Sequence, residues 1–235
     1  MEYMRNSLSK AIVSTFLICL GILAASPLYS QKNTSNSFSE DKGKLAIMIG
    51  GQSVGTEEFS ISRDGDQWVA RGTTEYHGQS GSNKVIGELR LNSAGAPLKY
   101  VWNTEGEKKA SSTTVFNGLT AQISLELGGK PVSQDFTFTS PVVVLDNNLY
   151  HQYEVLARVY NWAAGGPQNF AVLIPQQQTP GMLTAEMRGP AILDGARYEQ
   201  LAVHTSNLDL MLYLDSAHRL MRLSVPAANA EIRRQ

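Results

Sequence analysis

Short runs of residues that alternate between apolar and polar side chains most constrain what this 235-residue chain can fold into. In the run from residue 67 to 76, Trp68, Ala70 and Gly72 alternate with polar neighbours, and similar runs return further along the chain, at 84–91, 98–103 and 119–127. Successive side chains of a strand point to opposite faces, so each run predicts a strand with one face in a core and one in water. Such strands are typical of antiparallel sheets.

Turn residues separate these runs at the spacing of β-hairpins. Asp64-Gly65 precedes the first run, and Asn117-Gly118 precedes the last. Asn and Gly tolerate the positive φ that a two-residue type I′ turn requires, so Asn117-Gly118 is the strongest of these turn signals. The order of strands and turns predicts a meander in which each strand pairs with the one before it.

One segment follows a helical period instead. Its large apolar residues recur at i, i+4, i+7 and i+11: Leu149, Tyr153, Leu156 and Tyr160. That stripe predicts an amphipathic helix over about 147–161. Asp146 and its two Asn neighbours can cap the start of this helix, and Gly165-Gly166 can end it.

The predicted fold is therefore mostly β, a curved antiparallel sheet that forms a half-open barrel or β-roll. We expect about eleven or twelve strands and the one helix at 147–161. No shift in composition divides the body of the chain, so residues 44–226 are predicted to form a single β-rich domain. Residues 227–235 are expected to be a polar C-terminal tail.

The first thirty residues have the order of a secretory signal peptide. Basic Arg5 and Lys10 precede an apolar run at 11–25, and small residues follow it. The run is shorter than the roughly 20 residues that span a bilayer, although an uncleaved anchor remains the alternative. We expect cleavage after Ser30, a flexible polar leader at 31–43, and a protein exported to the periplasm or secreted from the bacterial envelope.

Composition excludes several function classes. The formal net charge is −1, which argues against binding nucleic acid by neutralising phosphates. The single cysteine, Cys19, lies within the predicted signal peptide, so an internal disulfide framework and a cysteine-built metal site are excluded. The four histidines are dispersed and no phosphate-binding glycine loop occurs, so we expect no metal site and no cofactor.

The residues from Gly51 to Gly55 match the G-x-S-x-G pattern of a hydrolase, with Ser53 as nucleophile. That pattern works where a helix follows the serine. Here Phe59 and Ile61 keep the period of a strand, which predicts a glycine kink inside a strand. We therefore expect no catalytic residue, and hydrolysis at Ser53 is the weakest of three functional alternatives.

Aromatic side chains recur at positions predicted to face inward. An ordinary β core explains them, but they could also line an apolar cavity between the rolled sheet and the helix. On that interpretation the candidate ligand-binding residues are Trp68, Tyr100, Trp102, Phe136, Phe138 and Tyr153.

The stretch from Leu45 to Phe59, in which a strand ends in Gly and another Gly starts the return strand, resembles the opening of a group of uncharacterised exported bacterial β-roll proteins. The order of strands, one helix and strands also resembles, more loosely, the LolA/LolB-type lipoprotein carriers. That resemblance implies a half-open barrel that holds acyl chains, and it assigns no lipid-contacting residue in this chain.

Two interpretations stand ahead of the hydrolase. In the first, the protein is a non-catalytic binding or carrier module for an apolar small molecule, a lipid or an envelope partner. In the second, it is a structural or assembly factor that acts through its sheet surface or edge strands. Neither involves nucleic acid, and membrane contact is expected only through the N-terminal segment if that segment stays uncleaved.

Overall fold

The computed structural model of the chain describes residues 38–78, 81–106, 109–127 and 130–235. These residues belong to one compact unit, Thr34–Gln235. The predicted signal peptide and the first part of the predicted leader lie outside the described residues. Within them, fifteen strands form a single sheet, and one α-helix and two short 3-10 turns complete the secondary structure.

The first eight strands precede the helix. They are β1 (Asp41–Ile49), β2 (Gln52–Asp64), β3 (Gln67–Gly78), β4 (Gly81–Leu91), β5 (Pro97–Glu105), β6 (Ala110–Asn117), β7 (Thr120–Leu127) and β8 (Lys130–Thr137). The remaining elements are β9 (Val142–Val144), α1 (His151–Val159), β10 (Pro167–Ile174), β11 (Thr179–Leu193), β12 (Ala196–Thr205), β13 (Asp209–Leu214), β14 (Leu220–Val225) and β15 (Ala230–Arg234). The 3-10 turns cover Pro175–Gln177 and Pro226–Ala228.

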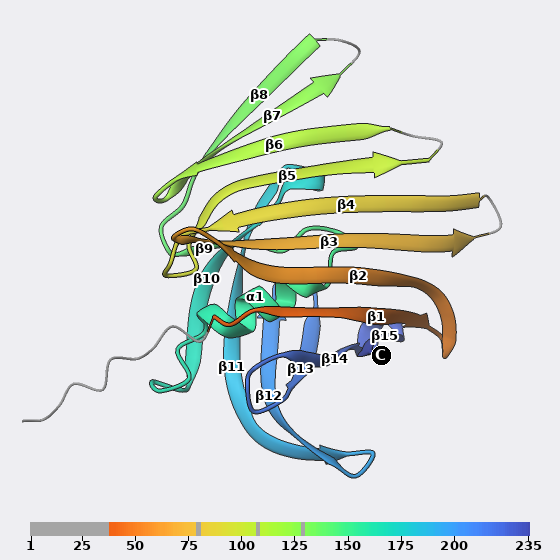
Figure 1. Cartoon of the computed structure of the whole chain (residues 1–235). Helices are drawn as coiled ribbons and strands as arrows, with labels where there is room; N and C mark the ends of the chain where they lie inside the picture. Colours follow the sequence, from red (N-terminus) through yellow and green to blue (C-terminus); the bar gives the residue numbers. More distant parts are fainter. Residues whose placement is uncertain (1–37, 79–80, 107–108, 128–129) are drawn as a thin grey trace, which may run out of the picture. The chain divides into compact units, whose positions relative to one another are not determined.

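Neighbouring strands of the sheet are antiparallel, except for β9 and β10, which run parallel. In spatial order, the sheet begins with edge strand β8 and passes through consecutive strands to β1 (Figure 1). The next neighbour of β1 is β15, and consecutive strands then follow from β14 to the other edge strand, β9. The first and last strands of the chain therefore pair in the middle of the sheet, with Ile47 opposite Ile232. The sheet does not close, because β8 and β9 remain its two edges.

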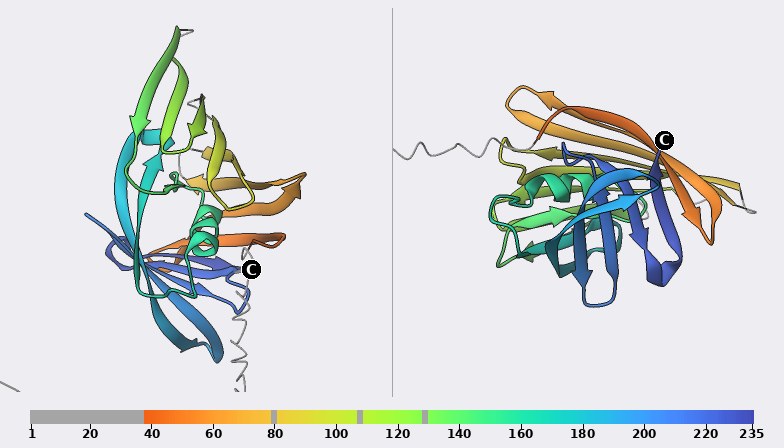
Figure 2. Two further views of the ribbon diagram at one scale, coloured as in Figure 1. Left: turned by 90° about the vertical axis from the view of Figure 1, so that its left-hand side faces the viewer. Right: turned by 90° about the horizontal axis from the view of Figure 1, so that it is seen from below.

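The sheet curves around α1, which lies on its concave side (Figure 2). This architecture confirms the predicted fold class: mostly β, curved, half-open, with one helix. The strand count is higher than the predicted eleven or twelve. Three-residue β9 is too short to show a period, and β15 lies in the segment expected to be a polar tail.

The glycines at 50 and 51 make a turn instead of a kink. Both have positive φ, 59° and 79°, and they join β1 to β2 as a two-residue hairpin loop. The expected kink inside one strand is therefore a complete reversal between two strands. Ser53 is exposed near the start of β2, and β2 continues as a strand, so the serine does not occupy a strand-to-helix turn.

The helix is shorter than the predicted 147–161 and is buried on more than its apolar stripe. Its first residue is His151, and its N-cap residue, Tyr150, supplies no side-chain hydrogen bond. Besides apolar residues, α1 buries polar and charged side chains, namely His151, Gln152, Glu154 and Arg158. Because the sheet wraps around the helix, its polar face also needs partners within the protein.

Two glycines opposite each other on β3 and β4 allow the helix to approach the sheet. A Cβ atom on Gly72 would lie 2.4 Å from the His151 ring, and one on Gly87 would lie 2.5 Å from Leu149 Cδ1. No side chain fits at those distances. The glycine pair therefore defines where the start of α1 rests on the concave face.

The sheet begins and ends beyond the predicted domain limits. Strand β1 starts at Asp41, inside the segment expected to be leader, and β15 occupies residues 230–234 of the expected tail. Both segments have one buried face: Leu45 and Ile47 on β1, and Ile232 on β15. A strand of five residues buries too few side chains to show a clear period in the sequence.

Candidate functional site

The six aromatic residues singled out from the sequence lie in the core or at its margin. Trp68, Tyr100, Trp102, Phe136 and Phe138 are buried, and Tyr153 is half-buried on α1. The structure brings some of them into pairs. Tyr100 and Trp102 share the inner face of β5, while the Phe136 and Phe138 rings stack with centroids 6.5 Å apart. Their role as a ligand-binding set stays a prediction.

An apolar slot lies where edge strand β9 meets turns from the other half of the sheet. Its volume is about 510 Å³, within the range of small-molecule sites. Its walls come from the β4–β5 turn, the β6–β7 turn, the end of α1, and β9 and β10. The lining residues are 94–97, Gly118, Leu119, Pro141, Val142, Val143, Val159, Gln168, Asn169 and Phe170.

The slot offers a ligand apolar contacts. None of its lining residues is charged, and its two polar side chains bond to the protein. The Gln168 amide bonds to the backbone of Asn161 at 2.9 Å, and the Asn169 Oδ1 atom accepts the hydroxyl of Thr184 at 2.7 Å. Leu119, predicted from the alternation as an inward strand residue, instead lies in the turn, 45% exposed, and lines the slot. None of the six predicted aromatic residues lines it.

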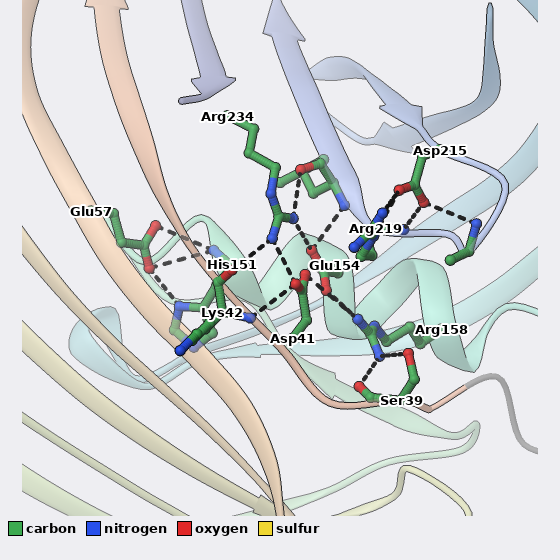
Figure 3. A network of polar contacts seen from close by, with 12 residues as sticks. Ser39, Asp41, Lys42, Glu57, His151, Glu154, Arg158, Asp215, Arg219 and Arg234 are labelled. Carbon is green, nitrogen blue, oxygen red and sulfur yellow. Dashed lines mark hydrogen bonds and ion pairs between the residues drawn. The ribbon is translucent and has the colours of Figure 1, made fainter.

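A buried carboxylate from the sheet caps the helix. The Glu57 carboxylate accepts the backbone N–H of Tyr150 at 2.7 Å and that of His151 at 3.2 Å. It also bonds to His151 Nδ1 at 2.5 Å, and both side chains are fully buried (Figure 3). A carboxylate only accepts hydrogen bonds, so Nδ1 is the nitrogen that donates. Glu57 thereby replaces the cap expected from Asp146.

Asp146 has other partners. It accepts the hydroxyl of Tyr100 at 2.8 Å and the backbone N–H of Gln176 at 3.0 Å, and its own N–H bonds to Gln152 Oε1. Burial raises the pKa of Asp146 above its usual value, although these hydrogen bonds counteract the rise. Asp146 therefore ties β5 to the loop before α1 and to the turn after β10.

A second group of polar side chains connects α1 to the seam of the sheet, which is the pairing of β1 with β15. Arg234 Nη2 on β15 contacts Asp41 Oδ1 on β1 at 2.7 Å, and Arg234 Nη1 lies 3.5 Å from Glu154 Oε2. Glu154 also pairs with Arg158 and accepts the backbone N–H of Leu220 at 2.8 Å (Figure 3). The two acids and two arginines balance in formal charge. We call Asp41, Glu154, Arg158 and Arg234 the seam cluster.

The two acids of the seam cluster have pKa values that are shifted in opposite directions: that of Glu154 is raised and that of Asp41 is lowered. Burial raises the pKa of Glu154 to about 7; Arg158 opposes this rise, and Asp41 adds to it. Burial also acts to raise the pKa of Asp41, but hydrogen bonds and the charge of Arg234 outweigh it and leave that pKa below its usual value. Glu154 is therefore the acid of this cluster that titrates nearest to neutral pH.

Comparisons with known proteins give one distant likeness. No family model and no curated protein matches the chain. Among solved structures, it is similar to the crystal structure of a DUF1089 family protein from Pseudomonas aeruginosa. The two share 14% sequence identity with a TM-score of 0.49, over 73% of this chain and 90% of that one. None of these comparisons links the chain to the LolA/LolB-type carriers, and that resemblance stays an expectation.

Within the described residues, no group of three or more His, Cys, Asp or Glu side chains could hold a metal ion. In that same part of the chain, no helix has the length and hydropathy needed to cross a membrane.

Sequence reasoning missed the buried polar residues, although one signal for them was available. Glu57 and Glu58 are consecutive on a strand, so one of them must face the core. The apolar residues Phe59 and Ile61 show that the inward one is Glu57. The seam cluster had no comparable signal, because Arg234 lies in a segment without an evident period.

Proposed function

We propose that this protein is a non-catalytic module that binds an apolar ligand, such as an acyl chain or a lipid, in the slot beside β9. One observation carries the proposal: the slot has about 510 Å³ of space and no charged lining residue. Burying an apolar ligand there gains about 25 cal/mol per Å² of apolar surface removed from water. The Gln168 amide and the Asn169 Oδ1 atom already have partners within the protein, and an apolar ligand in the slot leaves these bonds in place.

We also propose that the protein is exported to the periplasm or secreted. We infer export through the envelope from the basic, apolar and small order of residues 1–30. N-terminal sequencing of the protein from a fractionated bacterial host would test this inference. We expect the protein in the periplasmic or secreted fraction with Gln31 as its first residue. Recovery in the cytoplasmic fraction with Met1 intact would contradict it.

Ligand binding is tested with a fluorescent fatty acid, dansyl-labelled undecanoic acid, and a variant that fills the slot. Ala94 lines the slot in an exposed turn, where its N–H bonds to Asn92 Oδ1 at 2.9 Å. Ala94→Phe adds a ring to the lining of the slot and is expected to weaken binding of the probe about tenfold or more, equivalent to at least ~1.4 kcal/mol.

The chain offers a matched control. Ala217 is also an exposed turn alanine whose N–H bonds to a side-chain oxygen, Asp215 Oδ1, at 2.9 Å, and it lies outside the slot. Ala217→Phe should bind the probe as the unmodified protein does. Equal affinities for both variants, or no binding to the unmodified protein, would sink the proposal. The second result would instead favour a structural or assembly role.

A further inference from the structure

A second group of residues, none of which lines the slot, has buried polar side-chain atoms that form no hydrogen bond within the described part of the chain. Trp102 Nε1, Ser112 Oγ and Thr114 Oγ1 are buried and have no hydrogen-bond partner among the residues that the structure describes. Buried polar atoms in native proteins are nearly always paired, and an unpaired one costs about 1–3 kcal/mol. A group of such atoms at one place in the fold therefore requires an explanation.

The strand register places these residues next to one another on the concave face. Trp102 on β5 lies directly opposite Ser112 on β6, and Thr114 lies opposite Tyr100, two residues further along each strand. Directly opposed residues point to the same face of a sheet, with Cβ atoms about 5 Å apart.

The concave face leads from these atoms toward open solvent. Ser112 lies opposite Leu125 on β7, and Leu125 lies opposite Val132 on edge strand β8. We call Trp102, Ser112, Leu125 and Val132 the inner row. Exposure rises along it, because Trp102 and Ser112 are buried, Leu125 is half-buried, and Val132 is 42% exposed. On the other side of Trp102, Leu149 covers Gly87 and blocks the row.

The unpaired atoms define what this place can recognise. An indole N–H only donates, whereas the two hydroxyls can donate or accept. A partner must therefore supply an oxygen that accepts hydrogen bonds. Neither the inner row nor the neighbouring row through Tyr100 and Thr114 contains Lys or Arg, so a buried carboxylate would lack a counter-charge there. An uncharged oxygen, such as a ketone or ester carbonyl, meets both conditions.

We propose that the inner row is a binding site for an uncharged apolar molecule that carries a carbonyl oxygen. The carbonyl accepts hydrogen bonds from Trp102 Nε1 and Ser112 Oγ, and the apolar chain lies along Leu125 and Val132 toward the open edge at β8. This site shares no residue with the slot beside β9, so it stands whether or not that slot binds a ligand.

Nuclear magnetic resonance of the indole groups tests the proposal in the full chain. The chain has three tryptophans, and Trp102→Phe identifies the indole peak of Trp102 while keeping an aromatic ring at the site. Adding 2-decanone is expected to shift that peak in a saturable manner. Decane, which has the chain but no oxygen, should not produce that shift. An unmoved Trp102 peak, or the same shift with decane, overturns the proposal.

A serine pair supplies the matched control. Ser112→Ala removes one hydroxyl of the inner row and should weaken 2-decanone binding about fivefold, the effect of one neutral hydrogen bond. Ser124→Ala alters an exposed serine of β7 that bonds to Ser133, and it should leave the affinity unchanged. Equal affinities of the two variants contradict the assignment. If Ser112→Ala does not fold, the indole peaks of the unmodified protein decide the question.

The same titration separates the two sites. Ala94→Phe alters the slot and not the inner row, so its Trp102 peak should still respond to 2-decanone as in the unmodified protein. If this variant abolishes the response, the ketone binds in the slot and the inner-row proposal fails while the proposed function stands.

Discussion

At the scale of single residues, the closest contacts between the sheet and the helix pass over glycines. Gly72 lies under the His151 ring, and a Cβ atom there would also come within 2.5 Å of Glu57 Oε1. Gly72→Ala should therefore destabilise the protein by about 2 kcal/mol or more, since a fully packed site has no room to relax. Chemical denaturation measures this loss as a lower midpoint.

Gly181→Ala is the control for that substitution. Gly181 is also a strand glycine, but the only atom near its added Cβ is Val172 Cγ1 at 3.1 Å, the tip of a side chain. A shift of a few tenths of an ångström accommodates it, so we expect a change below about 1 kcal/mol. A Gly72→Ala variant as stable as Gly181→Ala would mean that the helix does not rest on this glycine.

The unpaired hydroxyl of Thr114 makes an opposite prediction. Thr114→Val keeps the shape of the side chain and removes a buried oxygen that has no hydrogen-bond partner among the described residues. The free protein should become more stable by about 1 kcal/mol, because burying an unsatisfied hydroxyl is unfavourable. Thermal unfolding in the absence of ligand would show a higher Tm. A lower Tm would indicate that the hydroxyl already has a stabilising partner.

The sequence predicted which residues face the core wherever a strand keeps a regular alternation of apolar and polar side chains. The inward side of β3 followed from alternation alone, as did the burial of Tyr100 and Trp102 on β5. The pairing of Glu57 with His151 was not predictable, because the two residues are 94 positions apart and only the folded chain brings them together. Local sequence patterns do not report contacts between residues that lie so far apart in the chain.

At the scale of elements, α1 depends on a cap that comes from another part of the chain. Glu57 satisfies two backbone N–H groups at the helix start and also holds the His151 ring. Glu57→Gln leaves one accepting oxygen and turns an NH₂ group toward donors. The expected loss is about 2–3 kcal/mol of unfolding free energy, the magnitude for hydrogen bonds to a charged group.

The neighbouring acid serves as control for the cap. Glu58 points to the outer face and pairs with Lys44 at 3.2 Å, with both side chains well exposed. Glu58→Gln should change stability by less than about 0.5 kcal/mol, since exposed ion pairs contribute little. Urea unfolding of both variants compares the two acids directly. Similar midpoints would refute the capping role of Glu57.

Elements with a long, regular period were predictable and short ones were not. The run at 119–127 appears as β7, although it begins one residue later because Leu119 belongs to the turn. The helix lies where its stripe predicted, but it starts at His151 because Asp146 bonds to Tyr100 and Gln176 instead of capping it. Because Tyr100 and Gln176 bind the Asp146 carboxylate, it does not cap the helix, and the helix begins later than predicted.

At the scale of the whole molecule, the seam cluster makes stability depend on pH. Glu154 has a pKa raised from 4.5 to about 7, so the folded state binds its proton more tightly than the unfolded state. Its contribution to stability is complete below pH 4.5 and is lost as the pH rises through about 7. We expect this contribution to the unfolding free energy to fall over this interval, and Glu154→Gln to remove it.

Denaturation midpoints at several pH values measure the slope. Asp41 acts in the other direction: its lowered pKa contributes stability that is lost as the pH falls through that pKa, below the usual value of 3.8. Burial also raises the pKa of Asp146 and lowers the pKa of His218, so these groups add their own pH dependence. The part that belongs to Glu154 is the difference in slope between the unmodified protein and Glu154→Gln. Glu58→Gln is again the control and should keep the slope of the unmodified protein. A slope unchanged in Glu154→Gln would refute the assignment.

The half-open sheet was predictable as a class, but its central pairing was not. The predicted meander matches the order of β2 to β8, in which each strand pairs with the one before it. The reversal between β1 and β2 was expected as a kink. The pairing of β1 with β15 joins residues nearly the whole described chain apart, and no local pattern reports it. The short β15 was expected as tail for the same reason.

That central pairing has a consequence for the connectivity of the fold. Because β1 and β15 are antiparallel neighbours, with Leu45 opposite Arg234, the start of β1 and the end of β15 form a hairpin that lacks its loop. A short linker from Gln235 to Glu40 would supply the loop, and new termini opened between Ser140 and Pro141 would cut the chain between the two sheet edges. In such a circular permutant every strand would follow its spatial neighbour, from β9 through β15 and β1 to β8. After the parallel crossover from β9 through α1 to β10, the fourteen strands from β10 to β8 would form one uninterrupted antiparallel meander.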